Sequence, residues 1–274
     1  MAGRMSAIKK LSLSPTPTFA APEKPHSRQT DGECALAVEV DAACVCAGSA
    51  VKNKPLAIDL FCGLFGWSEG LVAAGYEVIG FDLEDMHAVV GKKRPEHLRL
   101  VLQDVLTLHG SQFRDAALIV ASPPCQDFSY MAMPWSLAKA KAAAIRADKT
   151  GQMQADLTRL FDACFRIQRE ACEAAGRHIP MVVENVRGAQ PWVGRAAWNM
   201  GAFYLWGDVP ALMPVAVDMS GRKLGLKQGG TWWHDEGSIS RTTGSKSPAR
   251  KAASAMIAKI PFALSRHIAE VYRP

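Results

Sequence analysis

The stretch Leu56-Ala-Ile-Asp-Leu-Phe-Cys-Gly-Leu-Phe-Gly-Trp-Ser68 decides the fold, because it joins a short apolar run to a glycine-rich turn. A run of this length is typical of a buried strand, and a glycine-rich turn behind it is typical of the entry into a helix. We therefore predict a strand over Leu56–Phe61, followed by a helix. In a doubly wound sheet this turn lies at the carboxyl edge, where ligands bind.

The alternation of apolar runs and helical patterns continues outward from this stretch. The predicted strands are Leu56–Phe61, Glu77–Phe81, Leu98–Leu102, Leu118–Ala121 and Met181–Glu184. The clearest helix covers residues 152–175, where apolar residues, Cys164 among them, recur at three- and four-residue steps. Residues 136–149 are rich in Ala and Lys and form either a helix or a mobile loop. Strands alternating with helices predict an α/β fold around a mostly parallel, doubly wound sheet.

We predict four regions along the chain. Residues 1–52 contain many Pro, Ser and Thr and are expected to be a flexible, disordered leader. Residues 53–206 form the main domain, and residues 207–250 form a small, loop-rich region that glycines interrupt. Residues 251–274 are expected to form a helical return onto the main domain. The apolar residues Met256, Ile260, Leu264 and Ile268 recur there every four residues around Pro261.

Composition limits the class of protein. The 274 residues are 49% hydrophobic and 21% charged, which suits a globular protein with a sizeable core. No apolar stretch approaches the roughly 18 residues that a membrane helix needs, and no secretion signal is recognisable. Seven cysteines without a paired C-x-x-C spacing indicate neither a disulfide framework nor a zinc site. We expect a cytoplasmic protein with reduced thiols, no bound metal and no membrane contact.

The charge distribution favours a polyanionic partner. The formal net charge is +6, and seven Lys and Arg lie between Arg222 and Lys251 against only two acids. A solvated basic loop is the alternative interpretation of this segment. We interpret Trp232 and Trp233, which lie in the same segment, as packing residues of a small core.

Three successive predicted strands carry an aspartate near their ends, namely Asp59, Asp82 and Asp104. An acid at the end of the second strand can accept hydrogen bonds from ribose hydroxyls, so the series predicts a nucleoside pocket. N-capping of the next helix is the alternative role for Asp82 and Asp104. A nicotinamide dehydrogenase is disfavoured because residues 59–68 do not match G-x-G-x-x-G.

A thiol and a carboxyl are expected at the same edge of the sheet. The fourth predicted strand runs directly into Pro123-Pro124-Cys125-Gln126, and the prolines stiffen the turn that carries the thiol. The fifth predicted strand ends in Glu184-Asn185. Cys125 and Glu184 are therefore predicted to face one pocket, opposite the nucleoside acids.

These motifs resemble the C5-cytosine-specific DNA methyltransferase family. Asp59-Leu-Phe-Cys-Gly63 resembles its cofactor motif, Pro-Pro-Cys-Gln its nucleophile motif, and Glu184-Asn-Val186 its base-holding motif, in the same order. The likeness extends over about residues 56–272 and is closest to compact members encoded by phages or prophages. It implies a Rossmann-like, S-adenosylmethionine-dependent methyltransferase fold, in which residues 207–250 form a small target-recognition region. It also implies a bacterial cytoplasmic enzyme that acts on double-stranded DNA, and a monomer is favoured.

The resemblance implies a covalent mechanism. In this family a cysteine thiolate adds to C6 of cytosine, which makes C5 nucleophilic enough to take the methyl group. Cys125 would be the thiolate, and Glu184 would hold the N3 edge of the base. The base that removes the C5 proton is not identified, and a bound water is one candidate. A cytosine within a duplex must first be flipped out.

Roles for single residues are carried over by motif position. The family places Phe61 against the adenine, the backbone of Cys62 and Gly63 near the methionine, Asp82 on the ribose and Asp104 near the adenine amine. The expected catalytic residues are Cys125, Glu184, Asn185 and Arg195. The expected cofactor-binding residues are Asp59, Phe61, Cys62, Gly63, Gly66, Trp67, Asp82, Asp104 and Pro123. The expected DNA contacts are Gln126, Ser129, Arg187, Arg241 and Arg250.

The chain departs from the family pattern in four places. Phe65-Gly66 replaces two adjacent glycines, so the side chain of Phe65 is expected to narrow the cofactor turn. No Gln-x-Arg-x-Arg motif follows the fifth strand, so Arg195 is assigned only by its neighbourhood. Ile257-Ala258 replaces the usual Gly-Asn pair. The stretch between Asp208 and Arg250 is short for a target-recognition domain, which implies a short or relaxed recognition sequence.

An RNA-directed enzyme of the same family and a catalytically weak DNA-binding paralogue are the alternatives. Restriction–modification and phage genome protection both remain open as its setting.

Overall fold

The structure is a computed structural model and describes residues 54–129, 134–213 and 247–274. The predicted leader, residues 1–52, lies outside the described residues. So does most of the predicted recognition region, including Arg241, Trp232 and Trp233. The predictions for these segments therefore stay predictions.

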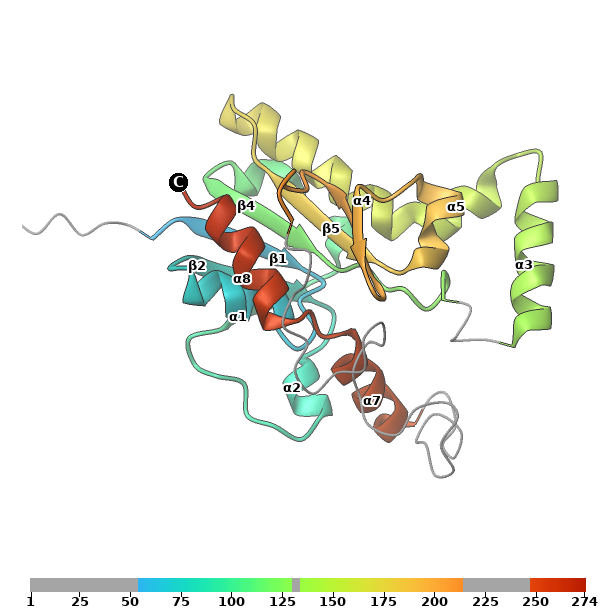
Figure 1. The fold of residues 1–274 in the computed structure, drawn as a ribbon, viewed down its shortest axis with the longest axis horizontal. Coiled ribbons are helices and arrows are strands. Elements are labelled where there is room, and N and C mark those ends of the chain that lie inside the picture. The colour runs from blue at the N-terminus through green and yellow to red at the C-terminus, as the bar shows by residue number, and fades with distance from the viewer. Residues whose placement is uncertain (1–53, 130–133, 214–246) are drawn as a thin grey trace, which may run out of the picture. The chain divides into compact units, whose positions relative to one another are not determined.

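A seven-stranded, mostly parallel sheet forms the centre of the fold (Figure 1). Its strands are β1 (Leu56–Leu60), β2 (Glu77–Asp82), β3 (Arg99–Leu102), β4 (Ala116–Ala121), β5 (Met181–Asn185), β6 (Trp198–Met200) and β7 (Phe203–Gly207). They lie in the order β3-β2-β1-β4-β5-β7-β6. Strands β1 to β5 pair in parallel, and β7 is antiparallel to both β5 and β6. The strand order reverses between β1 and β4, which is where a Rossmann-like sheet binds its ligands.

Helices cover both faces of this sheet. Helix α4 (Gln152–Ala175) covers one face, and α1 (Gly66–Ala73) and α8 (Phe262–Val271) cover the other. The other described helices are α2 (Met86–Val89), α3 (Trp135–Ala147), α5 (Gln190–Val193) and α7 (Pro248–Ala258). Three short 3-10 turns are η1 (Val105–Thr107), η2 (Gly110–Phe113) and η3 (Arg187–Ala189). None of the described helices is long and apolar enough to cross a membrane.

The side chains of β1 alternate between two hydrophobic cores. Ile58 and Leu60 pack with buried residues of α4, whereas Ala57 packs with buried residues of α1 and α8. The alternation follows from the pleat of a strand, which directs successive side chains to opposite faces. Helices on both faces make the sheet doubly wound, as the alternating sequence pattern predicts.

Two glycines let α1 approach α8 and the residues just before it closely. A Cβ atom on Gly66 would lie 2.5 Å from the Ile260 nitrogen, and one on Gly70 would lie 2.0 Å from Ser265 Oγ. The Ser265 hydroxyl also donates a hydrogen bond to the Trp67 carbonyl oxygen. The C-terminal helix is thereby held against the helix that follows the glycine-rich turn.

Most predicted elements are confirmed, with ends that shift by one or two residues. All five predicted strands are present, the helix over 152–175 is α4, and the Ala- and Lys-rich segment is helical as α3. Strands β6 and β7 were not predicted. The predicted C-terminal helical return consists of two helices: Pro261 separates α7 from α8, because its ring disfavours helical backbone in the residue before it. Ile260, Leu264 and Ile268 are buried as predicted, but Met256 is 42% exposed.

Candidate functional site

The glycine-rich turn after β1 has an unusual backbone. Phe61, Gly63 and Phe65 all have positive φ angles, of 58°, 51° and 58°. The Cys62 N–H donates to the Phe81 carbonyl oxygen at 3.1 Å, which ties the turn to the end of β2. Gly63 is partly exposed, and the nearest atom to a Cβ built on it would be 4.0 Å away. The turn therefore presents open backbone at the carboxyl edge of the sheet.

Asp82 closes this turn from β2. Its carboxylate accepts hydrogen bonds from the backbone N–H of Gly63 at 2.9 Å and of Leu83 at 2.8 Å. Burial nevertheless raises the pKa of Asp82 above its ordinary value, although these hydrogen bonds oppose the change. The side chain is only partly buried, so a ligand in the turn could still reach it.

Asp59 is fully buried beneath the same turn. The Ser68 hydroxyl donates to Asp59 Oδ2 at 2.6 Å, and Asp59 Oδ1 has no hydrogen-bond partner among the described residues. Burial raises the pKa of Asp59 to about 7, against the hydrogen bonds from Ser68, and nearby Asp82 adds to the rise. The structure thus places this carboxylate in the core, where it supports α1.

Three further residues expected at the cofactor are also buried. Trp67 is 2% exposed, and its Nε1 donates to Ser122 Oγ at 2.9 Å. Gly66 packs against Ile260, and Cys62 is 5% exposed with the pKa of its thiol raised by burial. These three residues therefore lie in the core behind the turn. Phe61 and Gly63, by contrast, lie partly exposed.

Phe65 lies in the core and leaves the face of the turn clear. Its ring is 1% exposed and clusters with Cys62 and Leu98, and it lies 5.8 Å from the His87 ring. A Cβ on Gly80 would lie 2.6 Å from the Phe65 ring, so the absence of a side chain at position 80 makes room for it. The side chain of Phe65 therefore does not narrow the turn. The consequence of having Phe65 in place of a glycine is instead a left-handed backbone at an aromatic residue.

Asp104 caps the short turn η1. Its Oδ1 accepts the Leu106 N–H at 2.9 Å, which is the capping role left open by the sequence. Three apolar side chains remain exposed at the ends of β2 and β3: Leu83 at 73%, Leu102 at 61% and Leu106 at 37%. The two acids Asp82 and Asp104 thus stand among exposed apolar groups, an arrangement suited to a nucleoside.

The loop after β4 carries the predicted nucleophile. The Ser122 N–H donates to the Leu60 carbonyl oxygen at 3.1 Å, which fixes the start of the loop to β1. Cys125 is partly exposed, and its carbonyl oxygen accepts the N–H groups of Phe128 and Ser129 at 3.1 and 2.9 Å. These bonds form a compact turn around the cysteine.

Asn185 joins this loop to β5. Its Nδ2 donates to the Pro123 carbonyl oxygen at 3.0 Å, its Oδ1 accepts the Val186 N–H at 2.8 Å, and it is fully buried. Val183 pairs with Ala121 in the sheet, so the residues that follow each strand leave the sheet at the same edge. Glu184, at 3% exposure, precedes Asn185 there. A shared pocket for Cys125 and Glu184 stays a prediction, which this shared edge supports.

The predicted DNA-contact residues and Arg195, which was expected at the catalytic site, occupy different surroundings. Gln126, Arg187 and Arg195 are exposed, whereas Ser129 and Arg250 are partly exposed. Arg195 follows Gly194, whose φ of 91° turns the chain toward β6. Arg241 lies outside the described residues.

Sequence reasoning missed two supports of the nucleophile loop. Ser122 Oγ accepts the hydrogen bond from Trp67 Nε1, and Lys141 Nζ on α3 contacts Asp127 Oδ1 at 2.5 Å. Ser122 and Asp127 flank the Pro-Pro-Cys-Gln motif, and this position was the sequence signal that could have pointed to them. Their partners Trp67 and Lys141 lie elsewhere in the chain, so no local pattern identifies those partners.

A cavity of about 410 Å³ lies between this loop and α4. It is lined by Pro123, Pro124, Asp127, Phe128, Asp156, Leu157, Arg159, Leu160 and Phe161. Neither Cys125 nor Glu184 is among these residues. The cavity is therefore distinct from the predicted catalytic pocket.

Similar proteins of known structure are methyltransferases. A candidate DNA modification methyltransferase encoded within a prophage of E. coli is 22% identical, with a TM-score of 0.33, over 50% of this chain and 33% of that one. The Dnmt2 methyltransferase of S. pombe is 16% identical, with a TM-score of 0.31, over 52% and 37%. The methyltransferase EhMeth of Entamoeba histolytica is 12% identical, with a TM-score of 0.30, over 52% and 41%. The matched part thus spans less than half of each of these structures.

A family comparison covers the glycine-rich turn and the nucleophile loop. No curated protein matches the chain. The model of the C-5 cytosine-specific DNA methylase family matches residues 56–147, a range that contains the turn, Asp82, Asp104 and Cys125. The chain is thus similar to the C-5 cytosine-specific DNA methylase family through residues 56–147.

Proposed function

We propose that this chain is a DNA cytosine-5 methyltransferase, which transfers a methyl group from S-adenosylmethionine to a flipped-out cytosine through a covalent adduct on Cys125. The observation that carries the proposal is the buried bond from Asn185 to the Pro123 carbonyl oxygen. It joins the Glu184-Asn185 strand end to the loop of the cysteine, two residues before the thiol. The family match over residues 56–147 supports the same chemistry.

The residues around the glycine-rich turn fit S-adenosylmethionine. The open backbone at Gly63 admits a ligand close to the chain, and Asp82 offers carboxylate oxygens to ribose hydroxyls. Exposed Leu83 and Leu102 offer apolar contact to an adenine ring, and Asp104 lies two residues after Leu102. When bound, the cofactor would supply an electrophilic methyl group on a sulfonium.

Cys125 and Glu184 would perform the chemistry on the base. The thiolate of Cys125 adds to C6, and the electron pair moves to C5 as Glu184 holds the N3 edge. After methylation at C5, loss of the C5 proton to a base re-forms the double bond and expels the thiolate. A bound water is a candidate for this base.

DNA is the proposed substrate because of charge and accessibility. The chain carries a net charge of +6, and Arg187 and Arg195 are exposed just after the strand that bears Glu184. Arginines in such positions can contact phosphates and hold a duplex while one base is turned out. We expect the full chain to bind DNA without a metal ion.

Transfer of a tritiated methyl group tests the proposal. The full-length chain is incubated with labelled S-adenosylmethionine and either duplex DNA or tRNA, beside Cys125→Ser and the control Cys172→Ser. Cys172 lies on α4, where its Sγ accepts the Ile179 N–H at 3.2 Å, away from the nucleophile loop. We expect label in DNA with the wild type and the control, and none with Cys125→Ser.

The other outcomes separate the alternatives. Label in tRNA alone would establish an RNA-directed enzyme, and DNA binding without label would establish a catalytically weak paralogue. Duplex containing 5-fluorocytosine should trap a covalent complex that withstands denaturation, since fluorine does not leave as a proton does. The absence of that complex from an active enzyme would contradict the role of Cys125.

A further inference from the structure

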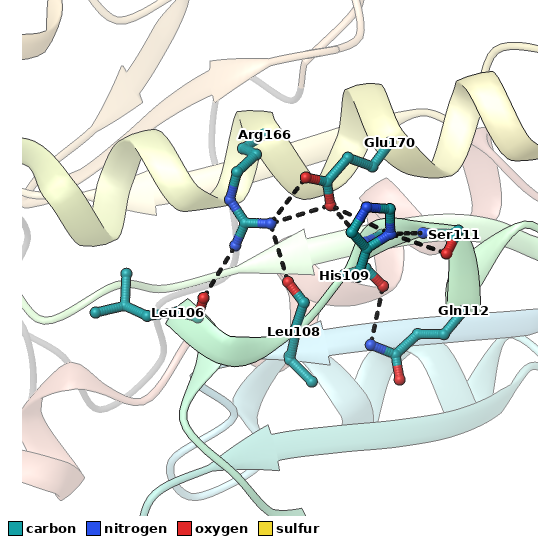
Figure 2. Close-up of polar contacts among 8 residues, drawn as sticks. Leu106, Leu108, His109, Ser111, Gln112, Arg166 and Glu170 are labelled. Carbon is teal, nitrogen blue, oxygen red and sulfur yellow. Dashed lines mark hydrogen bonds and ion pairs between the residues drawn. The ribbon is translucent and has the colours of Figure 1, made fainter.

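Two side chains of α4 hold the segment that follows Asp104 (Figure 2). Arg166 Nη1 donates to the Leu108 carbonyl oxygen at 2.9 Å, and Arg166 Nη2 donates to the Leu106 carbonyl oxygen at 3.3 Å. Glu170 Oε2 accepts the Gly110 N–H at 2.6 Å, and Glu170 also pairs with Arg166 at 2.9 Å. We call Arg166 and Glu170 together the α4 clasp.

The α4 clasp is partly shielded from water. The side chains of Arg166 and Glu170 are 33% and 20% exposed. Burial alone would raise the pKa of Glu170, but the hydrogen bonds from Gly110 and Arg166 lower it below its ordinary value. Both members of the clasp are therefore charged groups that make hydrogen bonds to the backbone. Such charge-assisted hydrogen bonds are stronger than bonds between neutral groups.

The segment it holds begins at a weakly fixed strand. β3 is the edge strand of the sheet, has four residues and pairs only with β2 among the described strands. Two of its residues, Val101 and Leu102, are exposed at 38% and 61%. The sheet holds the chain as far as Gln103, whose N–H donates to the Asp82 carbonyl oxygen at 2.9 Å, and Asp104 lies directly beyond it.

The remaining support comes from the turn that Asp104 caps. Asp104 Oδ1 accepts the Leu106 N–H, and the carbonyl oxygen of the same Leu106 accepts from Arg166. Behind this turn, Gly110 packs so closely on α4 that a Cβ there would lie 2.0 Å from the Ile167 carbonyl oxygen. Hydrogen bonds thus connect α4 to the Asp104 carboxylate through Leu106, and the buried Val105 packs in the same core as α4.

We propose that Arg166 and Glu170 are positioning residues for the adenine end of the cofactor, which act by fixing the capped turn that orients Asp104. This inference rests on the proposed function, because it assigns Asp104 to the cofactor. Arg166 touches neither cofactor nor base; it sets the place of a group that does. Its loss weakens cofactor binding and leaves DNA binding and the chemical step in place.

The test uses the full-length chain with Arg166→Gln, Glu170→Gln and Arg166→Lys. The matched control is Arg169→Gln, an exposed arginine of the same helix. Binding of S-adenosylhomocysteine is measured by calorimetry, and kcat and both KM values by methyl transfer to duplex DNA. Hydrogen exchange of the peptide over residues 103–113 reports directly on the turn.

We expect Arg166→Gln and Glu170→Gln each to raise the Kd of S-adenosylhomocysteine and the KM of S-adenosylmethionine about tenfold, the effect of one lost charge-assisted hydrogen bond. The kcat and the KM for DNA should change less than about twofold, because uniform binding is what is lost. Arg166→Lys should recover part of the affinity, Arg169→Gln should match the wild type, and exchange over 103–113 should rise in the two clasp variants.

Two results would overturn the inference. In the first, the clasp variants bind S-adenosylhomocysteine as the wild type does. In the second, kcat and both KM values change together, as general damage to the fold would cause. If the wild type itself binds no S-adenosylhomocysteine, the proposed function fails as well; if it binds and the variants bind equally, only the α4 clasp fails.

Discussion

The side-chain amide of Asn185 donates to the carbonyl oxygen of Pro123 at 3.0 Å, and both residues are buried. Asn185 is the last residue of β5, and Pro123 lies two residues before Cys125. A carbonyl oxygen buried without a donor costs roughly 1–3 kcal/mol, so this bond favours one conformation of the loop over others. The amide therefore links the placement of the thiol to the strand that carries Glu184.

Replacement of Asn185 should lower catalysis more than cofactor binding. Asn185→Ala leaves the Pro123 carbonyl oxygen unpaired, and a loop displaced by even a small distance loses the geometry of attack. We expect kcat to fall about tenfold or more, with the Kd of S-adenosylhomocysteine changed less than about twofold. The exposed Asn199→Ala on β6 serves as the control. A variant with wild-type kcat would show that the bond does not position Cys125.

Phe65 should show opposing effects of strain and packing. Its left-handed backbone costs about 1–2 kcal/mol for a residue with a Cβ, whereas loss of its buried ring costs about 3–5 kcal/mol. Phe65→Ala keeps the strain and loses the packing, while Phe65→Gly loses both. We expect both variants to be less stable than the wild type, and Phe65→Gly to be about 1 kcal/mol more stable than Phe65→Ala. Urea unfolding at one pH measures the order, and the reverse order would mean that the turn is unstrained.

The core strands and α4 could be predicted because their patterns are local. Runs such as Ile119-Val-Ala121 are apolar throughout, as central parallel strands buried on both faces should be. The hairpin of β6 and β7 gave a weaker signal, since β6 has three residues and none is fully buried. The run Phe203-Tyr-Leu-Trp206 was nevertheless a usable strand signal, with buried Phe203 and Leu205 on one core face and Trp206 on the other.

The place of Asp59 could also have been read from its strand. Asp59 is two residues after Ala57, so the period of a strand puts both side chains on the α1 face, away from the open edge. Its position in the motif suggested a ligand contact, which stays a prediction, and the pleat explains why its carboxylate is buried. The α4 clasp could not be predicted, because Arg166 and Leu108 are 58 residues apart and meet only in the folded chain.

Gly70 should tolerate no side chain. A Cβ there would lie 2.0 Å from Ser265 Oγ and 2.4 Å from the Arg266 nitrogen, so Gly70→Ala must push α8 away from α1. Backbone atoms cannot move aside cheaply, and overpacking of this kind costs about 1–3 kcal/mol or more. Gly91→Ala is the control: it has nothing within 4 Å, and its φ of +68° gives only the ordinary backbone cost. Thermal unfolding should show a clearly larger loss for Gly70→Ala; equal losses would contradict the close packing of the two helices.

Asp59 should make the stability of the chain depend on pH. Burial raises its pKa from 3.8 to about 7, so between these values the folded state holds a proton that the unfolded state has released. Stability from this group is therefore fully present below pH 3.8, is lost as the pH rises toward 7, and stays lost above it, by an amount on the order of 4 kcal/mol.

The variant Asp59→Asn has no such proton, and its side-chain oxygen can still accept the hydrogen bond from Ser68. We expect its stability relative to the wild type, measured by urea unfolding, to increase from pH 5 to pH 8. The control Asp115→Asn, at 84% side-chain exposure, should run parallel to the wild type. Parallel pH curves for Asp59→Asn and the wild type would mean that the carboxylate is charged and solvated, and that it does not lie under α1.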